Sequence, residues 1–175
     1  MPYYSANQFI IFRTIFGCYL AWHFYTIISY GPEIFGPNGM VPNPAIMPTW
    51  GIFPSVLHIP KNEIFVKIYL AMLSIASIIF AIGLQRRIIS IFIWYGWAYL
   101  LNRNILISNP GIPYVGWLLI ACAIIPTGEG YIWDLFKKQP KNNEWYMPSV
   151  IYWGAYFLMA LGYTISGIHK LQCQS

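Results

Sequence analysis

The polar side chains best suited to chemistry in this chain surround one arginine, Arg103. It stands between Asn102 and Asn104, with Asn109 shortly after, inside the largely apolar stretch 94–126. A guanidinium stays charged at any accessible pH, so it can hold an anion or stabilise developing negative charge but cannot act as a general base. We take these four residues as candidate ligand-binding residues and Arg103 also as a candidate catalytic residue. The alternative is that Arg103 clamps backbone carbonyls at a helix end.

Four further polar residues stand in or beside apolar runs. His169 and Lys170 are adjacent near the end of the last run, and either titrates near neutrality if partly desolvated. Glu33 is a carboxylate just beyond the first run. These three are candidate catalytic residues, with a snorkelling Lys170 and a solvated Glu33 as the alternatives. His23 is a candidate ligand-binding residue, unless it simply hydrogen-bonds to a neighbouring helix.

No pattern for metal or phosphate chemistry is present in the sequence. The histidines have no histidine or cysteine partner at metal-binding spacing, so we predict no metal site. Neither a glycine-rich phosphate loop nor a nucleophile elbow is found, and the three cysteines predict no disulfide. No cofactor is evident, although a quinone-like or lipid ligand would suit so apolar a chain. Any chemistry must come from dispersed residues that the fold brings together.

The composition predicts a membrane protein. Of the 175 residues, 58% are hydrophobic and 9% are charged, whereas soluble domains have about 25% charged residues. A chain of this length and composition needs lipid as its solvent, so the bilayer is its first expected partner. The net charge of +5 comes from basic residues near the ends of apolar runs. It therefore indicates membrane topology and not nucleic-acid binding.

The apolar runs predict an all-α integral membrane protein with about five transmembrane helices, at residues 9–30, 64–84, 88–108, 112–126 and 147–168. The fourth run is shorter than the ~20 residues that a crossing needs. It either packs inside the bundle or begins at an Asn-Pro-Gly corner that dips into the membrane. Residues 31–60 are rich in proline and glycine, which forbids a regular helix or sheet. We predict that they form a folded extracytoplasmic cap, with short interfacial helices.

Basic residues orient these helices in the membrane. Those predicted on one side outnumber those on the other: Arg86, Arg87, Lys137, Lys138 and Lys141 against Lys61 and Lys170. The N-terminus is therefore predicted in the cytoplasm and the C-terminus outside. Arg13, about one turn inside the first run, is expected to snorkel to the near interface. Arg103 is expected to point into the bundle, with Glu33 and His169-Lys170 as its nearest long-range partners on the outer face.

Short motifs along the chain fall in a characteristic order: Phe12-Arg13 with Phe16-Gly17, Gly36-Pro37, Leu101-Asn102-Arg103-Asn104 with Asn109-Pro110-Gly111, and Ser166-Gly167-Ile168-His169-Lys170-Leu171. In this order they resemble the HTTM family of transmembrane proteins. That family includes vitamin K-dependent γ-glutamyl carboxylase and the sporulation-delaying-protein B-like bacterial proteins. The resemblance runs from about Phe9 to Leu171 and implies one HTTM-like domain over residues 1–175. It also implies a helical bundle with its site on the extracytoplasmic side.

Two departures from the family bear on function. In the carboxylase an Asp-Lys pair takes the place of Asn102-Arg103 and its lysine is the working base, so we expect no glutamate carboxylation here. Family members also continue beyond the motif that ends at Leu171, so we expect a minimal or C-terminally truncated relative. We predict a non-catalytic or accessory subunit of a membrane assembly, with other membrane subunits as partners and a polar site on the outer face.

Two alternatives stay open, and with them whether the protein is an enzyme. One is a membrane enzyme that modifies a peptide or lipid-like substrate at the extracytoplasmic face. The other is a quinone- or lipid-binding protein. A solvent-reachable polar pocket around Arg103 would favour the enzyme, whereas an Arg103 plugged by the protein's own side chains would favour the subunit.

Overall fold

The computed structural model describes residues 4–46, 62–107, 109, 111–136 and 145–172, and within them the chain is all-helical. Its long helices are α1 (Ala6–Ile27), α3 (Glu63–Ile82), α4 (Arg86–Arg103), α5 (Gly111–Ile124) and α6 (Ser149–Gln172). Shorter helical segments are α2 (Gly31–Phe35), η1 (Pro44–Ile46), η3 (Ile105–Ile107) and η4 (Ile132–Phe136).

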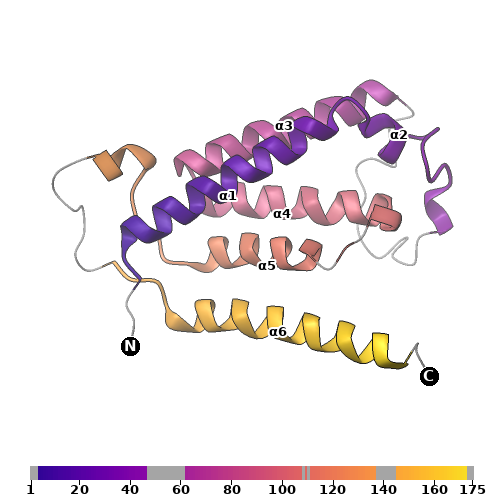
Figure 1. Cartoon of the computed structure of the whole chain (residues 1–175). Coiled ribbons are helices and arrows are strands. Elements are labelled where there is room, and N and C mark those ends of the chain that lie inside the picture. The colour runs from indigo at the N-terminus through magenta and orange to yellow at the C-terminus, as the bar shows by residue number, and fades with distance from the viewer. Residues whose placement is uncertain (1–3, 47–61, 108, 110, 137–144, 173–175) are drawn as a thin grey trace.

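The five long helices lie at the five predicted apolar runs and differ from them by a few residues at either end. Among the described helices, α3 and α6 are long and apolar enough to cross a membrane. This property concerns their length and composition only, and a membrane crossing by five helices is taken up below as a proposal. The short α5 lies between α4 and α6 (Figure 1), so the fourth run packs against neighbouring helices along its length.

Local sequence signals explain where two of these helices begin and end. Before α1, Ser5 Oγ accepts from the Gln8 backbone N–H at 3.4 Å, and Gln8 Oε1 accepts from the Ser5 backbone N–H at 2.9 Å. This is a capping box, which fixes a helix start. Helix α3 ends at Gly83, whose φ of 99° is left-handed and favours glycine. A Cβ at this position would also collide with the guanidinium of Arg13.

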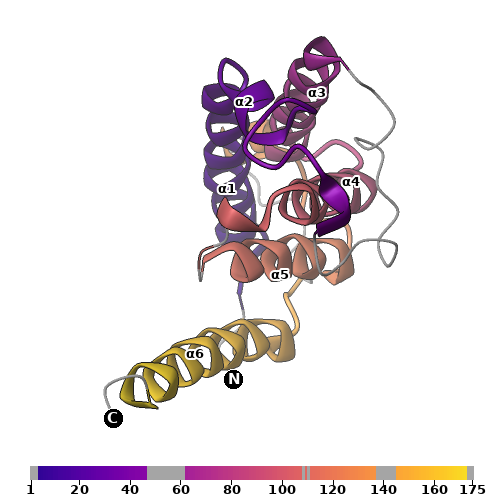
Figure 2. The same cartoon turned by 90° about the vertical axis from the view of Figure 1, so that its right-hand side faces the viewer.

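The tightest helix contact joins α1 to α3. A Cβ on Gly17 would lie 2.7 Å from the Cβ of Ala81, so only glycine lets the two backbones come this close. The core continues from this pair to α4 and α5 through fully buried apolar side chains that include Leu20, Phe24, Leu70, Leu73, Phe80, Ile93 and Leu119. Helix α6 stands apart below α5 (Figure 2), with most of its side chains exposed.

The bundle has two ends that carry different connections. At what we call the cap end, α2 and η1 lie beside the C-terminal end of α4, and the last turns of α6 extend in the same direction (Figure 1). At the turn end, the α3–α4 turn lies near residues 125–136, and the first turns of α1 and α6 are on this side. Residues 47–61, half of the predicted proline-rich cap, lie outside the described residues.

Candidate functional site

Arg103 is buried at the cap end, where it joins α4 to the chain that follows α2. Its side chain is only 3% exposed. Nη1 donates to the carbonyl oxygen of Val41 at 2.7 Å, and Nη2 donates to that of Gly36, also at 2.7 Å. Hydrogen bonds from a charged donor are among the stronger ones, and they offset part of the cost of burying the guanidinium. We call Arg103 and these two carbonyls the cap clamp.

The neighbouring asparagines extend this contact. Asn104 is fully buried; its Nδ2 donates to the Ile34 carbonyl at 3.0 Å, and its Oδ1 accepts from the Leu106 N–H at 3.0 Å. Asn102 is also buried, with 9% of its surface exposed. The predicted trio 102–104 therefore lies in the interior, and at least two of its members bind backbone groups of the protein itself.

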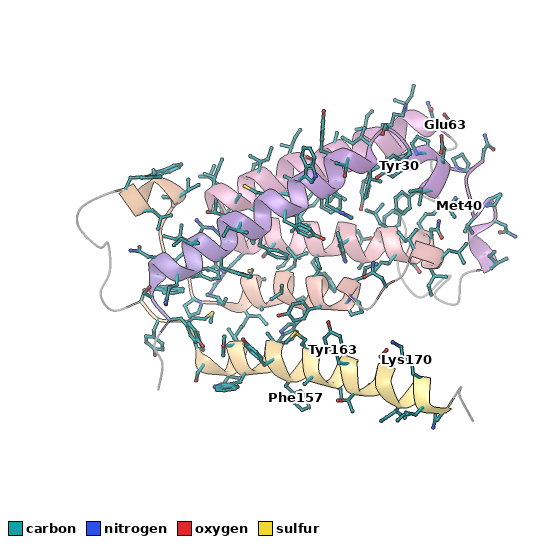
Figure 3. The ribbon with its side chains drawn as sticks, viewed as in Figure 1. Tyr30, Met40, Glu63, Phe157, Tyr163 and Lys170 are labelled. Atoms are coloured by element: carbon teal, nitrogen blue, oxygen red, sulfur yellow. The ribbon has the colours of Figure 1, made fainter. Side chains whose placement is uncertain are left out.

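The other predicted catalytic residues do not join Arg103 through contacts in the described part of the chain. Glu33 is exposed on α2, and within the described residues its carboxylate makes no hydrogen bond or ion pair. Lys170 is exposed near the end of α6 (Figure 3), and the side chain of His169 lies outside the description. The expectation that Glu33 and Lys170 are partners of Arg103 is therefore wrong. The described partners of Arg103 are the backbone carbonyls of Gly36 and Val41.

His23 and Asn109 lie on one groove of about 300 Å³ between α1, α4 and α5. The His23 ring centroid is 5.2 Å from that of Trp97 and 6.1 Å from that of Tyr19. Asn109 Oδ1 accepts from the Gly111 N–H at 2.9 Å, so this residue also starts α5. The groove is mainly apolar and its volume is at the lower limit for small-molecule sites. Two of the predicted ligand-binding residues thus share a cavity.

A second polar cluster, at the turn end, was not predicted. Arg13 is 0% exposed, Arg86 3% and Glu129 6%. Oε1 of Glu129 lies 2.9 Å from Nη1 of Arg13 and 2.5 Å from Nε of Arg86. The expectation that Arg13 snorkels to the interface is therefore wrong, because its guanidinium points into the interior. Arg86, counted above as a loop charge, is likewise a buried residue in the first turn of α4.

Backbone carbonyls complete the coordination of both arginines. Arg86 Nη2 donates to Ile125 and Pro126, each at 2.9 Å, and Nη1 donates to Cys122. Arg13 donates to Gly130 at 3.1 Å and to Ile82 at 3.2 Å. The cluster thus joins α1, the end of α3, the first turn of α4 and the end of α5 around one carboxylate. We call Arg13, Arg86 and Glu129 the buried ion cluster.

The sequence did contain a signal for this cluster. The chain has only five acidic residues, and Glu129 is one of them, set between two glycines at the end of an apolar run. In so apolar a chain, an arginine inside a run needs an anion or several carbonyls. This pattern therefore indicates a pairing of Arg13 with one of the few acidic residues.

Among the described residues, no group of three or more histidine, cysteine, aspartate and glutamate side chains is placed to hold a metal ion.

Comparison with known proteins finds no match among family models, curated proteins or solved structures. The resemblance to the HTTM family therefore stays a prediction from the sequence motifs.

Proposed function

We propose that this protein is a multi-pass membrane protein that serves as a non-catalytic subunit of a membrane assembly. The observation that carries the proposal is the cap clamp. Both terminal nitrogens of Arg103 donate to carbonyls of the chain itself, those of Gly36 and Val41, and the side chain is 3% exposed. These bonds use two of the five N–H donors of the guanidinium within the fold, and burial keeps the group from a substrate in solvent.

The proposed topology has five crossings, a cytoplasmic N-terminus and an extracytoplasmic cap end. Large apolar side chains are exposed on the outside of several helices, among them Trp22 at 67%, Ile88 at 65% and Phe157 at 66%. Exposed apolar surface on this scale suits contact with lipid or with another protein. Although Arg86 is buried, Arg87 and the lysines at 137, 138 and 141 still outnumber Lys61 and Lys170, which supports this orientation.

We propose that the chain is a distant HTTM-like protein whose motif residues maintain the fold. Several of them have structural contacts: Arg13 pairs with Glu129, Gly17 packs on Ala81, and Arg103 donates to Gly36. None of these contacts requires a substrate. They favour a shared architecture without carboxylation, since Arg103 cannot act as a base.

Helix α6 is the surface that we propose for contact with a partner subunit. It packs mainly against α5 at the edge of the bundle (Figure 2), and Val150, Phe157 and Tyr163 are between 66% and 78% exposed. A Cβ on Gly162 would meet nothing within 4 Å. Small residues on an open face let a second membrane helix approach closely. The proposed occupant is a transmembrane helix of another subunit.

Photo-crosslinking in the native membrane tests this proposal. A photoreactive residue at Tyr163 on α6 (Figure 3) should give one discrete crosslinked protein, and a matched residue at Ile78 on α3, also exposed at 51%, should give only lipid adducts. Lipid adducts alone at both positions would contradict the subunit proposal.

The groove at His23 favours a second candidate function, binding of a quinone-like or other amphipathic small molecule. Tyr19 and Trp97 offer ring faces, and His23 offers a polar atom for a carbonyl or hydroxyl group. Organic extraction of purified protein should then release a ligand near one equivalent, and Val115→Trp, which fills the groove, should reduce it several-fold. An extract without ligand from the wild-type protein would remove this candidate.

A further inference from the structure

A cavity of about 580 Å³ opens at the turn end, beside the buried ion cluster. Its walls are the α3–α4 turn with the start of α4 on one side and residues 127–131 on the other. A volume of this size is within the range of small-molecule sites. None of the contacts described for the cap clamp or for the His23 groove involves it.

The side chains around this cavity carry an excess of positive charge. Arg86 and Arg87 line it directly, and Arg13 lies behind Gly83 in its wall. Glu129 also lines it, but both arginines of the ion cluster already share its carboxylate, at 2.9 and 2.5 Å. Asp134 is the nearby second carboxylate, and its Oδ2 accepts from the Tyr131 N–H at 2.7 Å. Three guanidinium groups therefore face two carboxylates.

Arg87 is the group most available to a ligand. It is exposed, and the one hydrogen bond described for its side chain is a long one, from Nη2 to the Ile125 carbonyl at 3.4 Å. The first-turn N–H groups of α4 have no intrahelical acceptor, and Gln85 at the N-cap gives them no side-chain hydrogen bond. The positive end of the helix dipole adds to the attraction for an anion.

We propose that this cavity binds a phosphate group through Arg87 and the first turn of α4. A guanidinium fork matches phosphate oxygens in pairs, which makes arginine well suited to this anion. Under the proposed topology the cavity opens at the cytoplasmic leaflet, where anionic phospholipids gather. The source of the phosphate is a lipid headgroup or a free phosphate ion. The site does not depend on the subunit proposal, and only the lipid source uses the proposed topology.

Thermal unfolding of the full chain in neutral detergent distinguishes the sources. Phosphatidylglycerol should raise the Tm in a saturable way, because a ligand that binds only the folded state stabilises it. Phosphatidylcholine should not, because its choline cation neutralises the phosphate and is repelled by the arginines. The same rise with inorganic phosphate, against chloride at equal ionic strength, would assign the site to free phosphate as well. No rise with either phosphate source would overturn the proposal.

Variants locate the effect. Arg87→Gln should weaken phosphate binding about ten-fold, and Thr127→Asp, which adds a negative charge to the opposite wall, should abolish it. Lys67→Gln is the matched control, because it removes an exposed positive charge from the other end of α3. The Tm of each variant without ligand reports whether it folds, and Thr127→Asp alters no hydrogen bond of the described structure. Equal weakening by Lys67→Gln and Arg87→Gln would mean general attraction to a basic protein and would overturn the site.

Discussion

Arg13 and Glu129 are 116 residues apart in the sequence, yet Nη1 of Arg13 lies 2.9 Å from Oε1 of Glu129 in the interior of the bundle. The same carboxylate oxygen accepts from Nε of Arg86 at 2.5 Å. A single acidic side chain therefore connects the first helix to the first turn of α4 and to the segment after α5. Its removal should affect the whole bundle.

Glu129→Gln should lower the free energy of unfolding by about 3–5 kcal/mol, because it leaves two buried guanidinium groups without their carboxylate. Denaturation in detergent micelles, followed by tryptophan fluorescence, measures the change. Glu33→Gln is the control: this carboxylate is exposed on α2, and its loss should cost less than about 0.5 kcal/mol. Equal stability of the two variants would show that the ion cluster does not support the fold.

Gly17→Ala should destabilise the α1–α3 contact by about 1–3 kcal/mol, because the new methyl group would lie 2.7 Å from the Cβ of Ala81. Gly162→Ala is a matched control, since a Cβ there meets nothing within 4 Å. Both changes gain the same helix propensity, so the difference between their unfolding free energies isolates the steric clash. A difference near zero would mean that α1 and α3 do not approach as closely as described.

The helix positions could be predicted from the sequence because a run of apolar residues is a local property. The inward placement of Arg103 followed from the cost of exposing a guanidinium to lipid. The hydrogen-bond partners of Arg103 could not be predicted from the sequence. They are the backbone carbonyls of Gly36 and Val41, and every residue has a carbonyl, so no side-chain pattern marks them.

The buried ion cluster and the His23 groove depend on how distant segments pack. Arg13 lies one turn inside its helix, and the sequence does not distinguish a side chain that extends to the membrane interface from one that points inward to Glu129. The choice depends on where the loop after α5 folds back. Likewise, His23 and Trp97 meet only because α1 crosses α4 at that level. Such contacts are set by tertiary packing, which spacing along one chain does not reveal.

Arg103→Leu should lower the Tm in detergent, because it leaves the Gly36 and Val41 carbonyls without their donors and so frees the cap from α4. Arg103→Lys keeps the charge but lacks the fork that reaches both carbonyls, so it should recover only part of the loss. Arg87→Lys, an exposed change of the same kind, serves as the control. A leucine variant as stable as the parent would show that the cap clamp does not stabilise the fold.

The topology predicts the access of a membrane-impermeant thiol reagent added from outside intact cells. In a chain whose native cysteines are replaced by serine, a cysteine at Asn38, exposed near the cap end, should be labelled. One at Asn142, beside Lys141 in the sequence, should react only after the cells are opened. The reverse labelling pattern would place the cap end in the cytoplasm and the turn end outside, and so would contradict the proposed topology.

The most direct test of the subunit proposal is the mass of the particle extracted from the native membrane in mild detergent. The account predicts a hetero-oligomer of fixed stoichiometry, well above the 20.2 kDa of the chain. It also predicts that Gly162→Leu, on the open face of α6, releases the chain as a monomer with a Tm no lower than that of the isolated wild-type chain. A wild-type particle that contains only one copy of this chain would contradict the central claim.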